Sequence, residues 1–409
     1  MNLNFNRLFF CALMCAATGP LSAGAAVDAL RSAAVSGETA AAIPPDVQLP
    51  AALALTESRG VWVDKSDLYK GKEYLLAALD QLKAANLNTL YLPIWHKGWV
   101  TYPGSAYAPA DPDMAKVDVK LMSWLIDEAH KRGFMVQAWT EYGFGTYHTP
   151  NALTDPSRGA ILDKRPELTS VDKDGRPYEH IPEWGYFYSM CPVNQASQDI
   201  VIALFTEALK VLPFDALNLD RMRFANANFC FCDHCKKKFR EDTGYELDSS
   251  IFDDPERLAS WRAWRKAQVT AFVGRLRAAV KDARPGMPVT AAVWYDTELD
   301  NMGQDWPAWL RKGYLDFAVP MVYWSGNDAT VDGSAGLAPA RGKVGVGISA
   351  ADCPKEEVAR QVRHARAKKM GGVAFWYLNP LLGMADYLKA EVFPTPAQPY
   401  AGTRAAKVK

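Results

Sequence analysis

Eight apolar, strand-like segments recur along this chain, and segments with helical spacing lie between nearly all of them. The strand-like segments are residues 59–64, 88–95, 134–142, 214–219, 288–296, 315–324, 343–350 and 371–379. Such alternation predicts a parallel sheet, and eight units predict a closed barrel. We therefore expect an α/β protein with a (β/α)8 TIM barrel fold, in which the first and last strands are neighbours. The sixth connection, residues 325–342, is the weak unit, because it shows no good helical pattern.

The ends of several strands carry polar and aromatic residues. The candidate substrate contacts among them are His96, Trp139, Arg221, Arg223, Tyr295, Tyr323, Trp324 and Trp376. In a parallel barrel all these strand ends converge on one face, where the chemistry of such barrels takes place. Guanidinium groups and carboxylates can hydrogen-bond hydroxyl groups, and aromatic rings offer stacking surface. The sequence therefore predicts a cleft for a polyhydroxylated ligand.

Asp220 closes the uninterrupted apolar fourth strand and is the first candidate for a catalytic acid. Hydrolysis of a glycosidic bond needs one carboxylic acid for the leaving oxygen and a second carboxylate to provide or activate the nucleophile. Glu141 closes the adjacent third strand and Asp296 the adjacent fifth, so both are candidate partners, and Asp352 is a more remote one. The alternative for each is an Arg–carboxylate pair that only holds the barrel rim. Strand alternation turns the two arginines after Asp220 to the opposite side, unless the strand has already ended.

A cysteine cluster, Cys230, Cys232 and Cys235, follows the fourth strand. Removal of a signal peptide with Cys11 and Cys15 would leave five of the seven cysteines. An odd number is a poor disulfide framework in an oxidising compartment and suits a metal site of three or four thiolates better. Thiolates favour zinc, so we expect a structural zinc ion on this loop. The alternative is a disulfide, Cys230–Cys235 or one that includes Cys191.

Residues 143–194 interrupt the alternation with a stretch that has no clear periodicity and many aromatic residues. A connection of this length inside a compact domain is usually functional, and in a barrel it would lie over the mouth. The 46 basic and 46 acidic residues cancel, so nothing in the charge balance favours nucleic acid or an anionic membrane as a partner.

The chain begins with a weakly basic and then apolar segment that ends near Ala25, as in a signal peptide. The apolar run is too short for a comfortable membrane span. We expect residues 1–25 to be a signal peptide, 26–58 a tether, 59–392 the barrel and 393–409 a C-terminal tail. The mature protein is then expected to be soluble and periplasmic or secreted, with a lipoprotein signal at Cys11 or Cys15 as the alternative. The sequence does not define the oligomeric state.

The segments RGVWVD, NTLYLPIWHKG, EAHKRGFMVQAW, FDALNLDRMRF and FAVPMVYW occur in this order between Arg59 and Ala390. In order and spacing they resemble the bacterial glycosyl-hydrolase-like family 10. The resemblance implies a (β/α)8 barrel that acts on bacterial or other polysaccharides, with peptidoglycan glycan a known target class. It also implies that Asp220 is the strand-end acid of the family.

The loop after the fourth strand departs from that family, which usually has a short, proline-containing stretch there. The Cys-x-Cys-x-x-Cys pattern of this chain is similar to the metal loop of some barrel β-galactosidases. In those proteins a further cysteine from the third-strand region completes a zinc site. The resemblance implies that Cys191 is the fourth ligand here.

Three functions are consistent with these features. The first is an exported glycoside hydrolase acting on a polysaccharide or oligosaccharide. The second is a carbohydrate-binding barrel without catalysis, since many functions share this fold. The third is a metal-dependent hydrolase, for example a deacetylase, which needs an open coordination position with His or carboxylate ligands, whereas three or four thiolates would saturate zinc structurally.

Overall fold

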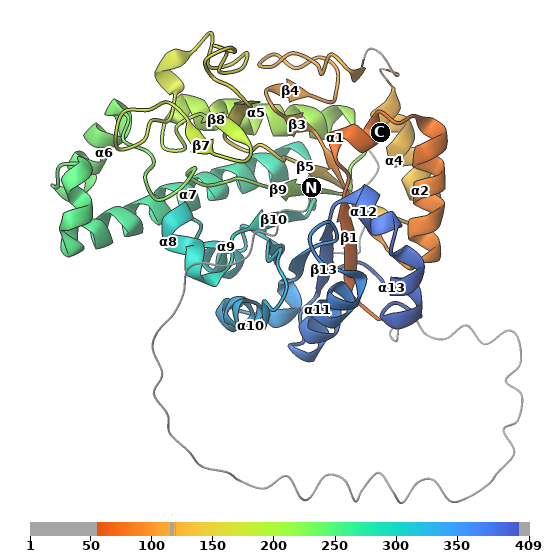
Figure 1. The fold of residues 1–409 in the computed structure, drawn as a ribbon. Coiled ribbons are helices and arrows are strands. Elements are labelled where there is room, and N and C mark those ends of the chain that lie inside the picture. The colour runs from red at the N-terminus through yellow and green to blue at the C-terminus, as the bar shows by residue number, and fades with distance from the viewer. Residues whose placement is uncertain (1–54, 115–117, 119, 401–409) are drawn as a thin grey trace, which may run out of the picture. The chain divides into compact units, whose positions relative to one another are not determined.

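The computed structural model describes residues 55–114, 118 and 120–400, which contain the predicted barrel (Figure 1). Its eight parallel strands are β1 (Ser58–Trp62), β2 (Thr89–Pro93), β5 (Met135–Trp139), β9 (Ala216–Leu219), β10 (Val289–Val293), β11 (Phe317–Pro320), β12 (Val346–Ser349) and β13 (Gly372–Trp376). Most are shorter than predicted, because the polar and aromatic residues that follow them belong to loops. The predicted signal peptide and most of the predicted tether lie outside the described residues.

The first and last strands of the barrel lie side by side, as a closed barrel requires. β1 pairs with β13 in parallel, with Gly60 opposite Ala374. The strand order is β11-β10-β9-β5-β2-β1-β13-β12, so the remaining junction is between β11 and β12. Backbone hydrogen bonds join these two strands, from Gly345 N to Ala318 O and from Val322 N to Gly347 O, each 2.9 Å long. The predicted (β/α)8 fold is therefore confirmed.

Helices follow the strands along the chain, and most of them cover the outside of the barrel (Figure 1). They are α1 (Lys65–Leu68), α2 (Lys72–Ala84), α4 (Leu121–Lys131), α5 (Gln195–Val211), α6 (Asp233–Thr243), α7 (Pro255–Ala283), α8 (Leu299–Met302), α9 (Trp306–Arg311), α10 (Asp328–Leu337), α11 (Lys355–Ala367), α12 (Leu378–Leu382) and α13 (Ala385–Glu391). The longest, α7, begins as the sequence predicts: Asp254 accepts hydrogen bonds from the backbone N–H groups of Glu256 and Arg257. Within the described part of the chain, no helix is both long and apolar enough to cross a membrane.

Helix α10 lies in the sixth connection, where we expected no good helix, so this expectation was wrong. The segment DATVDGSAGL is rich in poor helix formers, and its local propensity is weak. Contacts with α11 compensate for this weakness. Arg360 donates two hydrogen bonds to Asp328, and His364 and Lys368 both lie within 2.8 Å of Asp332. Tertiary contacts thus stabilise a helix that the sequence pattern does not reveal.

The aperiodic insertion, residues 143–194, forms a small antiparallel sheet beside the ends of β5 and β9. Its strands are β6 (Gly145–Thr149), β7 (Glu179–Ile181) and β8 (Gly185–Ser189), in the order β6-β8-β7. A second, two-stranded sheet of β3 (Trp95–His96) and β4 (Trp99–Val100) follows β2. Both small sheets extend the face on which the barrel strands end.

Residues 393–400, within the segment predicted to be a tail, cover the opposite end of the barrel. Phe393 is completely buried, with the guanidinium group of Arg59 4.6 Å from its ring centroid. Arg59 also donates a 2.7 Å hydrogen bond to the carbonyl of Thr395. Further along, the ring of Tyr400 lies 5.0 Å from that of Phe317, at the start of β11. This end of the barrel is therefore closed by packing, which leaves the opposite face for a site.

Candidate active site and metal centre

Asp220 lies directly after β9 and is held in one orientation by three hydrogen bonds. Its carboxyl group accepts the indole N–H of Trp139 at 3.0 Å and the backbone N–H of Arg221 at 2.7 Å. Its own backbone N–H donates to the hydroxyl of Thr140 at 2.9 Å. Trp139 ends β5 and Thr140 follows it. The neighbouring strand therefore holds both the side chain and the backbone of Asp220.

Burial dominates the electrostatics of Asp220, which is only 8% exposed. Removal of the carboxyl group from water raises its pKa to about 6, although Arg221, Trp139 and Arg223 act in the opposite direction. A carboxylic acid with a pKa near 6 holds its proton at mildly acidic pH and keeps part of it close to neutral pH, so it can donate that proton to a leaving group. The environment of Asp220 is therefore suited to general acid catalysis.

An aromatic cluster lies against Asp220 on the same face. The ring of Trp376 is 5.9 Å from Trp139, edge to face, and 6.2 Å from Tyr323, with which it is nearly parallel. Burial raises the pKa of Tyr323, and the nearby Asp220 carboxylate raises it further. Trp139 is only 1% exposed, so its contact in this structure is with Asp220 and the core. Tyr323 and Trp376 are partly exposed and offer ring surface beside the acid.

Glu141 lies two residues beyond the end of β5 and pairs with His96, which ends β3. The His96 Nδ1 and Glu141 Oε2 atoms are 2.6 Å apart. The Glu141 side chain remains 12% exposed, so it can still contact a ligand. The His96 ring also lies 5.1 Å from Tyr142, edge to face, which holds the pair against the third strand end.

Asp296 contacts residues of α10. Its backbone N–H donates to the hydroxyl of Ser334 at 3.3 Å, and a methyl group at Gly333 would meet the carboxylate at 1.9 Å. The preceding Tyr295 packs edge to face with Trp324 at 5.1 Å, and Trp324 is 39% exposed. These two rings form an accessible aromatic rim near α10.

Asp352, the remote candidate, is engaged in a local turn after β12. Its carboxylate accepts a hydrogen bond from the hydroxyl of Ser349 at 2.6 Å, and its backbone N–H donates to that hydroxyl at 3.0 Å. This pattern is that of a turn-forming aspartate.

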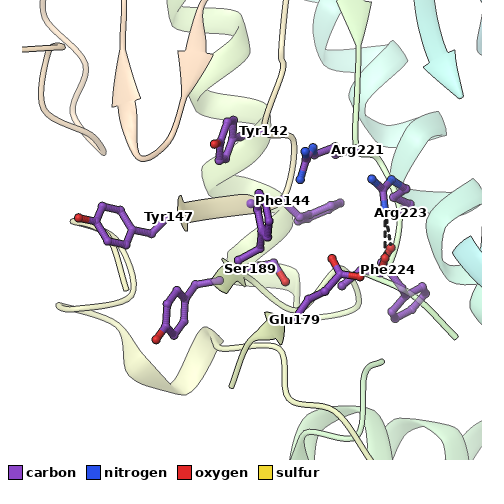
Figure 2. Close-up of a pocket in the computed structure, with 12 residues that line it drawn as sticks. Tyr142, Phe144, Tyr147, Glu179, Ser189, Arg221, Arg223 and Phe224 are labelled. Atoms are coloured by element: carbon purple, nitrogen blue, oxygen red, sulfur yellow. Dashed lines mark hydrogen bonds between the residues drawn. The ribbon is translucent and has the colours of Figure 1, made fainter. Parts of the chain in front are cut away.

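Arg221 and Arg223 line one pocket between the end of β9 and the inserted sheet (Figure 2). β9 ends at Leu219 and Arg221 has a left-handed backbone (φ 51°), so strand alternation does not apply to the two arginines. The loop fits because Gly143 packs directly on this turn; a methyl group there would lie 2.3 Å from the carbonyl oxygen of Asp220. Neither guanidinium group forms an ion pair with a carboxylate in the described residues.

The insertion contributes residues to this pocket that the sequence reasoning missed. Phe187 of the insertion and Tyr142, which directly precedes it, each place a ring centroid 5.3 Å from the Arg221 guanidinium, and Tyr147 and Glu179 of the insertion also line the pocket. Glu179 faces the two arginines and accepts a 2.8 Å hydrogen bond from Asn226 (Figure 2). No periodic pattern marks these positions; the run of aromatic residues was the only available signal.

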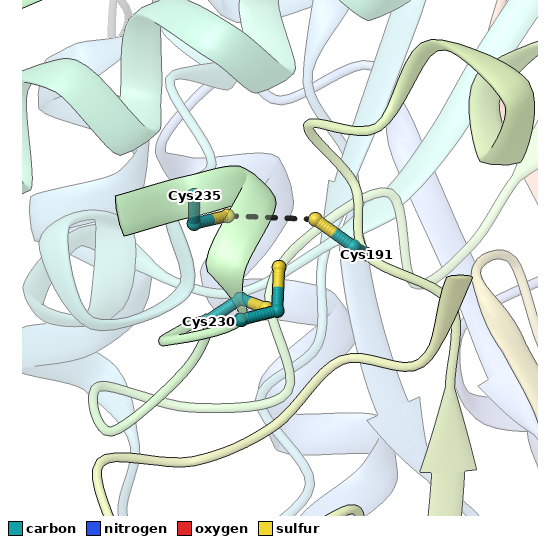
Figure 3. A group of neighbouring side chains, drawn as sticks. Cys191, Cys230 and Cys235 are labelled. Carbon is teal, nitrogen blue, oxygen red and sulfur yellow. Dashed lines mark hydrogen bonds between the residues drawn. The ribbon is translucent and has the colours of Figure 1, made fainter. Parts of the chain in front are cut away.

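Four cysteines meet where the end of this insertion contacts the loop before α6 (Figure 3). Cys191 follows β8, and Cys230, Cys232 and Cys235 come from the loop before α6 and its first turn; the four sulfur atoms lie within 4.8 Å of one another. A tetrahedral zinc site with Zn–S bonds of about 2.3 Å has sulfur–sulfur distances of about 3.8 Å, so the cluster fits such a metal. The Cys191 and Cys235 sulfurs are 3.4 Å apart, well beyond the roughly 2.05 Å of a disulfide bond. Cys353 lies apart, buried near Ser325.

Comparison with known proteins agrees with this barrel fold. Residues 57–339, more than half of the chain, match the family described as Glycosyl hydrolase-like 10. The chain belongs to this family. Glycosyl hydrolase DigH of Escherichia coli (strain K12) is 21% identical over 277 residues, which are 62% of this chain and 58% of that protein. Glycosyl hydrolase YngK of Bacillus subtilis (strain 168) is 23% identical over 294 residues, 64% of this chain and 52% of that protein. The matches thus span little more than half of these relatives.

Solved structures similar to this glycosyl hydrolase-like 10 protein are also barrels of carbohydrate-active enzymes. The glycoside hydrolase domain of PgaB (BpsB) from Bordetella bronchiseptica aligns with a TM-score of 0.63 at 16% identity, covering 82% of this chain and 97% of that one. The catalytic domain of β-amylase from Paenibacillus polymyxa aligns with a TM-score of 0.57 at 12% identity, covering 83% and 99%. At these identities the similarity shows the fold, and the family membership supports a hydrolase that acts on glycans.

In this family member, Arg265 of α7 connects the cysteine loop to the barrel. Its guanidinium group is fully buried and donates to the carbonyls of Asn226 at 2.6 Å and Asn301 at 2.9 Å. Burial lowers its pKa to about 9, while the neighbouring Cys235 and Cys230 raise it. A positive charge here would offset part of the negative charge of a metal-bound thiolate cluster.

Proposed function

We propose that this chain is an exported glycoside hydrolase that cleaves a polysaccharide or oligosaccharide, with Asp220 as the general acid. The observation that carries the proposal is the carboxyl group of Asp220, buried at a strand end and with a pKa raised to about 6. Membership of a glycosyl hydrolase-like family supports it. In the reaction, Asp220 transfers its proton to the glycosidic oxygen as the bond to the anomeric carbon breaks.

Glu141 is the second carboxylate in this proposal. It lies on the adjacent strand end, is accessible, and is held by His96, whereas the carboxylate of Asp296 is packed against α10. Its role is to attack the anomeric carbon or to activate the water that does so. Asp296 is then the weaker candidate.

The substrate is held along the face that carries these residues. Tyr323, Trp376, Tyr295 and Trp324 supply ring surfaces, His96 and the two pocket arginines supply hydrogen bonds, and Trp139 orients Asp220. Peptidoglycan glycan is the target class that we favour, on the basis of the family resemblance. Action in the periplasm or outside the cell follows from the predicted signal peptide.

A structural zinc ion completes the proposal. Cys191, Cys230, Cys232 and Cys235 would hold it and would fix the loop beside the pocket, with no open position for substrate. A metal-dependent deacetylase therefore finds no support in this cluster. The domain division into a signal peptide, tether, barrel and tail remains part of the same proposal.

The test is a reducing-end assay over a panel of polysaccharides that includes peptide-free peptidoglycan strands. We expect cleavage of at least one polymer, and a loss on the order of 10²-fold or more in rate for Asp220→Asn. Asp386→Asn, which makes the same chemical change on the exposed surface of α13, is the matched control. Binding to a polymer without release of reducing ends would favour a carbohydrate-binding barrel instead.

A further inference from the structure

The pocket beside Asp220 contains two guanidinium groups with unused hydrogen-bond donors. The Arg221 side chain lies between the rings of Tyr142 and Phe187 and makes no hydrogen bond to the residues that the structure describes. Arg223 donates from Nη1 to the carbonyls of Phe224 and Ala225. Its buried Nε has no partner in the described chain.

The guanidinium groups of Arg221 and Arg223 are close enough for the charge of Arg221 to lower the pKa of Arg223. Burial and the neighbouring Arg221 together lower the pKa of Arg223 to about 10, although Glu179 and Asp220 act in the opposite direction. Two like charges in one partly buried pocket are unfavourable unless an anion joins them. Glu179 is the nearby anion, but neither arginine lies within ion-pair distance of it. A ligand that brings its own negative charge would therefore complete the pocket.

The chemistry of the donors indicates a carboxylate. A planar guanidinium group presents parallel N–H donors that match the two oxygens of a carboxylate, and such charge-assisted pairs are stronger than bonds to neutral hydroxyls. Phe187 and Tyr147 are partly exposed in this pocket and suit a ligand whose carboxylate is attached to a sugar, because their rings offer surface for its apolar face.

The pocket is also placed next to the reacting groups. Asp220 does not line the pocket, but the backbone N–H of Arg221 donates to its carboxyl group, and the charges of Arg221 and Arg223 both lower the pKa of that group. Figure 2 shows Arg221 and Arg223 on the same side of the pocket, with Glu179 facing them. A sugar held by this pair would thus be a neighbour of the bond under attack.

We propose that Arg221 and Arg223 form a subsite for a carboxylate-bearing saccharide unit, so that the enzyme selects an acidic glycan. This rests on the proposed glycosidase function and deepens it. The carboxylate can belong to a uronic acid or to a lactyl ether of an amino sugar, since both present the same group. Glu179 lowers the affinity of this subsite for anions and narrows the range of anions that it accepts.

The test compares chains that differ only in the carboxylate. Peptide-free peptidoglycan strands and polygalacturonate are the two anionic probes; the methylamide of the first and the methyl ester of the second are the neutral ones. Dissociation constants are measured in the Asp220→Asn background, so that no chain is cleaved. We expect at least one anionic probe to bind on the order of 10-fold or more tightly than its neutral form, as a charge-assisted pair requires.

Variants of the pocket residues then test whether the preference for anionic over neutral probes depends on this pocket. Arg221→Gln should abolish it, whereas Arg363→Gln, which removes an exposed charge on α11, should preserve it. Glu179→Gln keeps the acceptor for Asn226 and should strengthen binding of the anionic probe alone. The comparison of anionic and neutral probes uses one protein and does not depend on the arginine variants. The proposal can therefore be tested even if Arg221→Gln folds poorly.

Equal affinity for anionic and neutral probes, or a preference that survives Arg221→Gln, would overturn the subsite. A preference confined to one anionic probe supports the proposal and identifies the source of the carboxylate. Cleavage of a neutral polymer without any carboxylate preference contradicts this inference alone and leaves the glycosidase function intact. Carboxylate-dependent binding without cleavage of any polymer by the parent protein supports the subsite and contradicts the glycosidase function.

Discussion

Replacement of Asp220 by Asn should change the pH dependence of stability in a defined direction. The pKa of this buried carboxyl group is about 6, against 3.8 for an ordinary aspartate. Because the folded-state pKa is raised, folding favours the protonated form. The resulting penalty on stability is absent below about pH 4, grows as the pH rises, and reaches its full value above about pH 6. The difference corresponds to about 3 kcal/mol of unfolding free energy.

Asn cannot ionise, so the variant escapes this penalty, but it also loses one hydrogen-bond acceptor. Asp220 accepts from both Trp139 and Arg221, whereas the amide oxygen of Asn satisfies only one of the two donors. That loss costs about 1–3 kcal/mol and is the same at every pH. The pH-dependent part of the difference therefore isolates the titration of Asp220.

Urea unfolding of both proteins, followed by tryptophan fluorescence, measures this difference. Between about pH 4.5 and about pH 8, the unfolding free energy of the variant should rise by about 2 kcal/mol relative to the parent, the part of the 3 kcal/mol that falls in this window. A difference that stays constant with pH would show that the carboxyl group is not destabilised by burial. A difference that falls with pH would show that its pKa is depressed, and either result would refute the assignment of Asp220 as a proton donor.

Other predictions concern activity and the metal. On a cleaved substrate, kcat/KM should fall as the pH rises above about 6, because Asp220 must be protonated; a rate that climbs through this range would contradict its role. Glu141→Gln should lower kcat on the order of 10²-fold or more with little change in the urea midpoint, and near-normal turnover would exclude Glu141 as the second carboxylate. Elemental analysis should find about one zinc ion per chain, and Cys191→Ser should reduce it and lower the melting temperature. Less than roughly a tenth of an equivalent in the parent protein would rule out the metal, since a saturated structural site holds about one.

The barrel could be predicted from sequence because each of its strands is buried on both faces and is therefore a short apolar run. The exact strand ends could not, since apolar residues such as Trp324 continue past the last paired residue. Helix α10 was not predicted, because its local sequence does not indicate the structure that it forms. Its local sequence opposes a helix, and the ion pairs from Arg360, His364 and Lys368 that stabilise it come from another element.

In the candidate site too, residues marked by the local sequence could be predicted, whereas residues placed by tertiary contacts could not. Asp220 could be found because it ends an apolar strand, and the clustering of Cys191 with the other three cysteines could be expected from the resemblance. Glu179 could not be found, because it belongs to an insertion without periodicity. The approach of Arg221 to the pocket depends on its left-handed backbone, which nothing in the residues around it indicates.

The most direct test of the account is the appearance of new reducing ends when the parent protein acts on peptide-free peptidoglycan strands in water enriched in oxygen-18. Mass spectrometry should find one oxygen-18 atom at each new reducing end, because hydrolysis adds one water oxygen there. Asp220→Asn should form these ends on the order of 10²-fold more slowly. If the strands and every other polysaccharide tested stay uncleaved, or if Asp220→Asn cleaves as fast as the parent, Asp220 is not the acid of a glycoside hydrolase.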